Sequence, residues 1–122
     1  TFVSLANVPT PAAEFDGIDM SKALLGKPQV RSNPIMWEYG RDAEYLQPAK
    51  PRDRSPNLAI RDGNWKLLVN DDGSRLELYD LSRSNQEVRN VASEHAEIAK
   101  RLSAKLLVWR KSLPVLPARN KE

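Results

Sequence analysis

Residues 58–80 read LAIRDGNWKLLVNDDGSRLELYD, a run in which two Asp-Gly pairs, Asp62-Gly63 and Asp72-Gly73, separate strand-like segments. Asp-Gly is typical of a two-residue hairpin turn, because both central positions of a type I′ turn need positive φ. Each pair is therefore predicted to join two antiparallel strands. The first turn then pairs Leu58 with Leu67, and the second pairs Leu67 with Leu78.

This register gives the predicted meander a single apolar face. The residues that share it are Leu58, Ile60, Trp65, Leu67, Val69, Leu76 and Leu78. A slip of one residue would divide them between both faces. Two independent turn assignments thus agree on one buried side.

The flanking sequence supplies a fourth strand and a covering helix. Apolar side chains alternate at Ile35, Trp37 and Tyr39, which predicts a strand. Further along the chain, apolar residues recur at spacings of four, four, three and four, which predicts a helix with one buried stripe. These residues are Ile98, Leu102, Leu106, Trp109 and Leu113. We expect an α+β fold, an antiparallel sheet of about four strands (34–39, 57–61, 64–70, 75–80) packed against a C-terminal helix at about 95–112.

The first third of the chain is predicted to hold little regular structure. Residues 2–7 resemble the last turns of a helix that Asn7 ends, and a helix so short at the chain start suggests a cut through a longer protein. A second short helix is expected to end near Leu25, with Gly26 as its C-terminal stop. We expect one subdomain, 1–122, divided into 1–33 (helix end, linker and short helix), 34–113 (sheet plus helix) and 114–122 (tail).

Composition narrows the chemistry. The chain has no cysteine, one histidine and a formal charge of +3. Thiolate and cysteine-zinc sites are therefore excluded within it, and the charge is too small to indicate nucleic acid. No apolar run approaches the roughly 20 residues that span a bilayer, so no membrane partner is expected. His95 and the aspartates at 16, 19, 71 and 72 are interpreted as cap and turn residues, so no catalytic or metal site is predicted.

One segment combines groups suited to ligand binding. Met36-Trp37-Glu38-Tyr39-Gly40 places an aromatic ring, a carboxylate and a phenol where a strand meets a long loop. That loop carries Arg41, Arg52 and Arg54, and guanidinium groups bind sulfate or phosphate oxygens in bidentate fashion. The alternative is that Trp37 and Tyr39 belong to the core and that Glu38 is solvated.

The order of several short segments resembles the C-terminal part of the sulfatase family, most closely bacterial arylsulfatases similar to N-acetylgalactosamine-6-sulfatase. The matching segments are DGIDMS at 16–21, LLG at 24–26, PIMWEYG at 34–40, RSPNLAIRDGNWKLL at 54–68, ELYDL at 77–81 and NVA at 90–92, with His95, Glu97 and Ile98. The likeness runs from Thr1 to about Pro114. Tyr39 stands where many relatives have histidine after Trp-Glu.

The resemblance implies a fragment of a two-part sulfuric ester hydrolase. An N-terminal domain, expected as the partner of this chain, would hold calcium and a formylglycine made in a Cys/Ser-x-Pro-x-Arg motif, which this chain lacks. The chain would then help form the cleft for a sulfated carbohydrate or aryl sulfate, and alone it should be inactive. The candidate substrate contacts are Trp37, Glu38, Tyr39, Arg54, Asn57 and Arg61. The resemblance also suggests a periplasmic or extracellular location.

Two other interpretations remain open at the level of sequence. The chain could be a self-standing module that binds sulfated glycans without cleaving them, or a fragment with no function of its own. A subdomain separated from its partner would expose apolar surface, so self-association is also expected.

Overall fold

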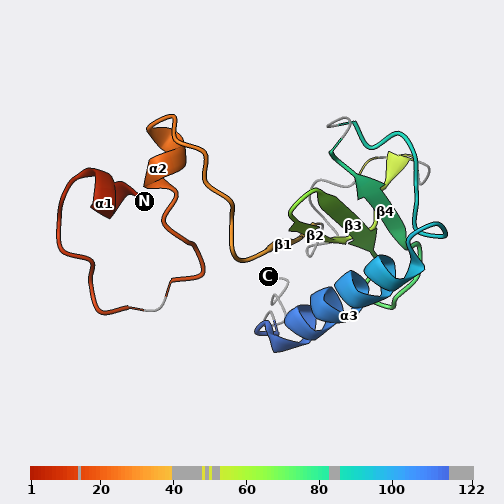
Figure 1. Ribbon diagram of the computed structural model, residues 1–122. Coiled ribbons are helices and arrows are strands. Elements are labelled where there is room, and N and C mark those ends of the chain that lie inside the picture. Colours follow the sequence, from red (N-terminus) through yellow and green to blue (C-terminus); the bar gives the residue numbers. More distant parts are fainter. Residues whose placement is uncertain (14, 40–47, 49, 51–52, 83–85, 116–122) are drawn as a thin grey trace. The chain divides into compact units, whose positions relative to one another are not determined.

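The computed structural model describes all residues except 14, 40–47, 49, 51–52, 83–85 and 116–122. The chain divides into two compact units, Thr1–Pro34 and Ile35–Glu122. The colours of Figure 1 follow the residue numbers, so each unit can be traced there. Most of the predicted tail, and the loop arginines Arg41 and Arg52, lie outside the described residues.

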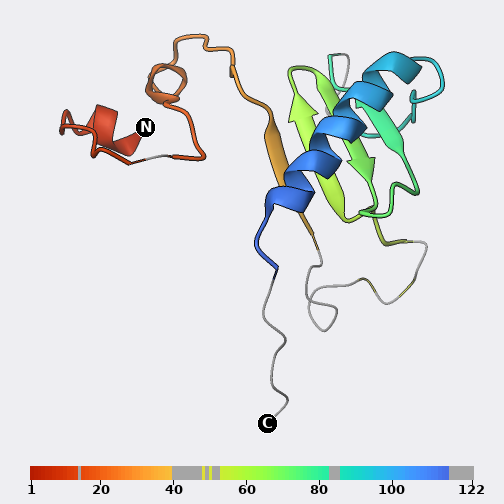
Figure 2. The same ribbon diagram turned by 90° about the horizontal axis from the view of Figure 1, so that it is seen from below.

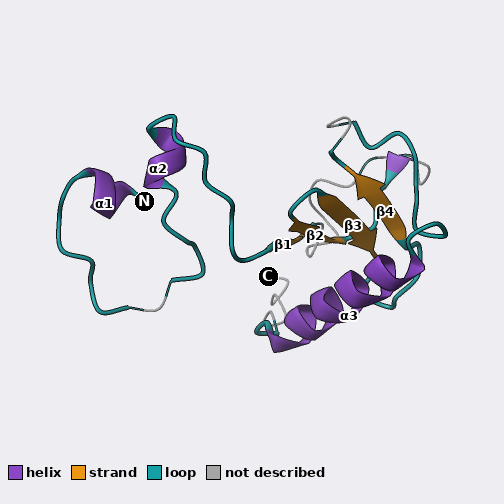
Figure 3. Cartoon of the chain, viewed as in Figure 1, coloured by secondary structure: helices purple, strands orange, loops and turns teal. Residues whose placement is uncertain are grey.

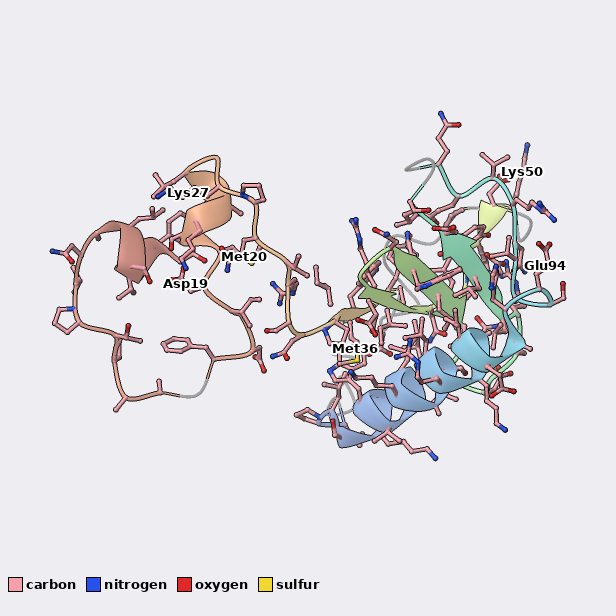
Figure 4. The ribbon with its side chains drawn as sticks, viewed as in Figure 1. Asp19, Met20, Lys27, Met36, Lys50 and Glu94 are labelled. Carbon is pink, nitrogen blue, oxygen red and sulfur yellow. The ribbon has the colours of Figure 1, made fainter. Side chains whose placement is uncertain are left out.

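The first unit contains two single-turn helices, α1 (Phe2–Leu5) and α2 (Ser21–Leu24), neither of which has a buried residue. Both helices end as predicted, because Asn7 and Gly26 adopt positive φ of 54° and 76°. After each, two backbone N–H groups donate back into the last turn, as in a Schellman motif. Figure 4 shows Asp19 at the start of α2, where its Oδ1 accepts the N–H of Ser21 at 2.9 Å.

The second unit is an antiparallel sheet with one helix. Its strands are β1 (Ile35–Glu38), β2 (Leu58–Asp62), β3 (Trp65–Val69) and β4 (Glu77–Asp80), and they lie side by side in the order β1-β2-β3-β4. The helix α3 (Ala96–Ser112) follows β4. Figure 3 shows helices and strands in this unit, so the predicted α+β class is confirmed.

The first hairpin differs from its predicted register. Asp62 pairs with Trp65, so the two-residue loop is Gly63-Asn64 and not Asp62-Gly63. Gly63 has φ of 58°, and glycine with positive φ at the first central position suits a type II′ turn. Leu58 therefore pairs with Val69, and the predicted pairing of Leu58 with Leu67 was wrong by two residues.

The second hairpin keeps its predicted register, since Leu67 pairs with Leu78. Its connection is longer than two residues, because β3 ends at Val69 and β4 begins at Glu77. The turn is closed by the N–H of Asn70, which donates to the carbonyl of Ser74 at 2.9 Å. Gly73 and Arg75 supply the left-handed backbone, with φ of 83° and 52°.

The core lies between one face of the sheet and α3, which crosses that face in Figure 2. Its buried residues are Leu58, Ile60, Leu67, Val69, Leu78, Ala99, Leu102 and Leu106. Met36 packs against this core from β1, and Figure 4 shows it between that strand and the helix. Of the predicted stripe, Leu102 and Leu106 are fully buried, whereas Ile98 and Trp109 are partly buried at its edge.

The outer edge of β4 is covered by the segment that leads into α3. Oδ1 of Asn90 accepts the N–H of Leu78 at 3.0 Å, and the N–H of Val91 donates to the carbonyl of Leu78 at 2.8 Å. Backbone groups at a sheet edge otherwise need water or another strand. The segment thus completes the hydrogen bonding of a residue that is fully buried.

Candidate functional site

The two faces of the sheet have different surroundings. Met36 on β1 and Leu67 on β3 pack toward α3, so their strand neighbours point to the other side. We call this other side the open face, because no described helix of the second unit crosses it (Figure 2). The strand residues on this face include Trp37, Ala59, Arg61, Lys66 and Leu68, and Tyr39 follows β1 on the same side.

A hollow of about 300 Å³ lies at one end of the open face, and we call it the arginine hollow. Tyr39, Arg54, Asn57, Asp71 and Arg75 are among the residues that line it. These side chains come from the end of β1, the segment before β2 and the turn between β3 and β4. Two guanidinium groups and one carboxylate therefore surround a space rimmed by an aromatic ring.

Asn57 ties these three segments together. Its carbonyl accepts the N–H of Tyr39 at 2.7 Å, which continues the pairing of β1 with β2. Its side-chain Oδ1 accepts the N–H of Asp71 at 3.0 Å. Because Asn57 is bonded both to the end of β1 and to the turn after β3, it fixes the width of the arginine hollow.

The two arginines of this hollow are held differently. Arg54 donates from Nε to the carbonyl of Pro48 at 3.1 Å. Arg75 lies with its guanidinium 3.6 Å from a carboxylate oxygen of Glu77, in an ion pair whose arginine side is exposed and whose carboxylate is half-buried. Ion pairs at the protein surface contribute little net free energy, so an incoming anion can compete for the exposed Arg75 guanidinium.

A second hollow of about 280 Å³, which we call the tryptophan hollow, lies beside the first. Ala59 and Leu68 are among its lining residues, and they are only 2% and 8% exposed. The Lys66 ammonium lies 5.5 Å from the centre of the Trp37 ring and pairs with the carboxylate of Glu87. Tyr39, Ser55 and Asn57 line both hollows, so the two adjoin.

Four of the six predicted contacts line the hollows of the open face. Trp37, Tyr39, Arg54 and Asn57 line one or both hollows. Glu38 points the other way, where its Oε1 lies 2.9 Å from Nε of Arg110 in α3. Arg61 is exposed and lies on the open face, where it pairs with Ile35 and Lys66 across the sheet, but it lines neither hollow.

Sequence reasoning missed two cations of the open face, Lys66 and Arg75. Lys66 alternates with the buried Leu67 along β3, so the period of two could have placed it opposite the core. Arg75 had no such signal, because its position depends on a positive φ of 52° that is unusual for a residue other than glycine.

A third hollow of about 370 Å³ is lined by residues of β4 and of the segment leading into α3, among them Tyr79, Glu94 and His95. Burial, together with a 2.8 Å hydrogen bond to the Glu77 carboxylate, raises the pKa of Tyr79 to about 12. The ring of His95, the single histidine of the sequence, lies 4.8 Å from that of Trp65. This contact gives His95 a packing role at the start of α3.

Aspartates that could suggest a cation site serve local turns instead. A hydrogen bond from the Ser21 backbone lowers the pKa of Asp19 below its ordinary value, and bonds from Ser74 lower that of Asp72. Calcium takes six to eight oxygen ligands. Among the described residues, no group of three or more histidine, cysteine, aspartate or glutamate side chains could hold a metal ion.

No family model matches the chain, and no curated protein matches it. Within the described part of the chain, no helix has the length and apolar character needed to cross a bilayer.

Proposed function

We propose that this chain is an accessory part of a sulfatase and that its open face binds the sulfated sugar of the substrate. The proposal rests on the resemblance of the sequence segments and on the chemistry of the two hollows. The hydrolytic step belongs, on that resemblance, to a separate N-terminal domain that carries calcium and formylglycine. The contribution of this chain is binding and orientation.

The observation that carries the proposal is the pair of guanidinium groups at the arginine hollow. Arg54 and Arg75 approach it from two different segments. A guanidinium fork matches the oxygens of a sulfate group and can donate two parallel hydrogen bonds to it. Asp71 leaves this site with a net positive charge and offers an acceptor for a sugar hydroxyl.

The aromatic side chains support a sugar as the rest of the ligand. Trp37 and Tyr39 are 37% and 39% exposed, although large aromatic rings are usually more buried than this. Both rings project from the same face of β1, two residues apart. Flat apolar rings beside a few polar groups are the usual lining of a small-molecule site.

One observation favours a second candidate, a self-standing module that binds sulfated glycans without cleaving them. All described residues that line the two hollows belong to the unit Ile35–Glu122. One compact unit of the chain therefore supplies these lining residues. The two candidates share the binding surface and differ in whether a hydrolytic domain is attached.

Binding to a sulfated polysaccharide tests the proposal. We expect the purified chain to be retained on immobilised heparin at about 50 mM salt and to elute as salt rises. Arg54→Ala should weaken binding roughly five- to tenfold, because it removes one of the two forks. Arg89→Ala is the matched control, since it removes the same charge from a side chain that is 74% exposed and lines neither hollow.

Equal losses for the two variants, or equal retention on an unsulfated polysaccharide of similar charge, would show general electrostatic attraction and overturn the proposal. The chain alone should not hydrolyse an aryl sulfate. Hydrolysis that survives calcium chelation and repeated purification would contradict the accessory role.

A further inference from the structure

We infer that the open face binds an oligosaccharide across two adjoining subsites, with a sulfate in the arginine hollow and a second acidic group beside Lys66. This inference rests on the proposed function and names the substrate class for the same surface. A single sulfated sugar or a small aryl sulfate would occupy only one of the two subsites.

The two hollows form one continuous surface. The two hollows have volumes of about 300 and 280 Å³, each at the lower end of the range for small-molecule sites. They share Tyr39, Ser55 and Asn57 as a common wall. A ligand that leaves one hollow along the sheet therefore enters the other, as successive units of a chain would do.

The two hollows differ in chemistry. The arginine hollow has two planar cations. The tryptophan hollow has an apolar floor of Ala59 and Leu68, an aromatic ring and one ammonium. The apolar floor and the aromatic ring can pack against the face of a sugar. The Lys66 ammonium can act as a point charge that attracts an acidic substituent.

Lys66 already has an anionic partner at the tryptophan hollow. Its ammonium pairs with Glu87 and lies over the Trp37 ring. The Lys66 and Glu87 side chains are 19% and 34% exposed, so the pair is accessible from the solvent side. Glu87 thus occupies the position that a carboxylate or sulfate of the second sugar would take, and such a ligand must replace it.

Three probes separate the subsites: glucosamine 6-sulfate, its disaccharide with galactose, and its disaccharide with glucuronic acid. Their affinities are measured by quenching of tryptophan fluorescence and by calorimetry on the full chain. We expect the acidic disaccharide to bind at least tenfold more tightly than the monosaccharide, with the neutral disaccharide between them.

Substitutions at the ion pair make the test specific. Lys66→Met keeps the aliphatic stem over the sheet and should abolish the difference between the acidic and neutral disaccharides. Glu87→Gln removes the competing carboxylate and should raise affinity several-fold for the acidic disaccharide alone. Lys105→Met, an exposed site on α3, is the control and should change none of the three affinities.

Equal affinities for the monosaccharide and both disaccharides would overturn the inference and leave the proposed function standing. A gain with Glu87→Gln that is the same for neutral and acidic disaccharides would also overturn it. Failure of all three probes and of heparin to bind would overturn both. Thermal unfolding of each variant shows whether a loss reflects misfolding.

Discussion

The guanidinium Nε of Arg110 lies 2.9 Å from Oε1 of Glu38, so the last turn of α3 is joined to the edge strand β1. The Glu38 side chain is only 8% exposed, whereas that of Arg110 is 27% exposed. A cation in the last turn of a helix also interacts favourably with the helix dipole. The pair fixes which face of β1 meets the helix and thereby turns Trp37 and Tyr39 to the open face.

Removal of Arg110 should therefore destabilise the second unit. Arg110→Met keeps most of the packing but leaves the Glu38 carboxylate without this partner, at a cost of about 1–3 kcal/mol. Urea unfolding followed by tryptophan fluorescence measures this, because all three tryptophans lie after residue 34. Arg101→Met is the control, since the Arg101 side chain is 59% exposed in its pair with Asp62 and should cost about 0–1 kcal/mol. Equal costs would show that the burial of Glu38 is unimportant.

The buried face of the sheet was predictable although the first register was not. The period of a strand is two residues, so the observed slip of two kept Leu58, Ile60 and Leu67 on the same side. The choice of Gly63-Asn64 over Asp62-Gly63 depends on turn geometry that both dipeptides can satisfy. The sequence pattern therefore predicts which face of the sheet is buried more firmly than it predicts which residues pair across the first hairpin.

The candidate site was predictable only in part. Alternation placed Trp37 and Tyr39 together, and the structure confirms that they share a face. A short strand with apolar residues on both sides does not reveal which side meets the helix. In this structure the side that carries Met36 packs against the helix. The closeness of Asn57 to Asp71 depends on a hydrogen bond between residues 14 positions apart, which local pattern cannot indicate.

Gly63 should be sensitive to substitution because of its backbone. Its φ is 58°, and an added Cβ would meet nothing within 4 Å, so the cost is conformational and not steric crowding. Gly63→Ala should lose about 1–2 kcal/mol of unfolding free energy. Gly63→Asn should lose less, since asparagine tolerates left-handed backbone. Urea unfolding of both variants tests this order, and an alanine variant as stable as the parent would contradict the assigned turn.

Asn90 should contribute to stability although it lies in an exposed segment. Its Oδ1 accepts the N–H groups of Leu78 and Ala92, both at 3.0 Å, and its Nδ2 donates to the carbonyl of Leu76 at 3.3 Å. Asn90→Ala leaves the buried Leu78 N–H without this acceptor, at a cost of about 1–3 kcal/mol. Asn90→Asp keeps the acceptor and should cost less.

Hydrogen exchange gives the local test for Asn90. The Leu78 amide should exchange faster in Asn90→Ala than expected from the global loss of stability, and Asn90→Asp should restore most of its protection. If alanine and aspartate were equally costly, the accepted bonds at the β4 edge would not be the source of the effect.

The raised pKa of Tyr79 predicts that the stability of the folded chain depends on pH in the alkaline range. Its folded pKa is raised to about 12, mainly by burial and then by Glu77, above an unfolded value of about 10. Between these values the unfolded chain has released the phenol proton and the folded chain still holds it. Stability from this group is therefore complete below about pH 10 and falls as pH rises toward 12.

The substitution Tyr79→Phe isolates this effect from the titration of lysines and other tyrosines, which both proteins share. At pH 8 the parent should be the more stable, since the variant lacks the bond to Glu77. Because only the parent loses the Tyr79 contribution, the gap between their urea midpoints should narrow from pH 9.5 to 11.5. Absorbance at 295 nm should show the last tyrosine titration missing in the variant. A constant gap over this range would mean that the Tyr79 phenol ionises equally easily in the folded and unfolded chains.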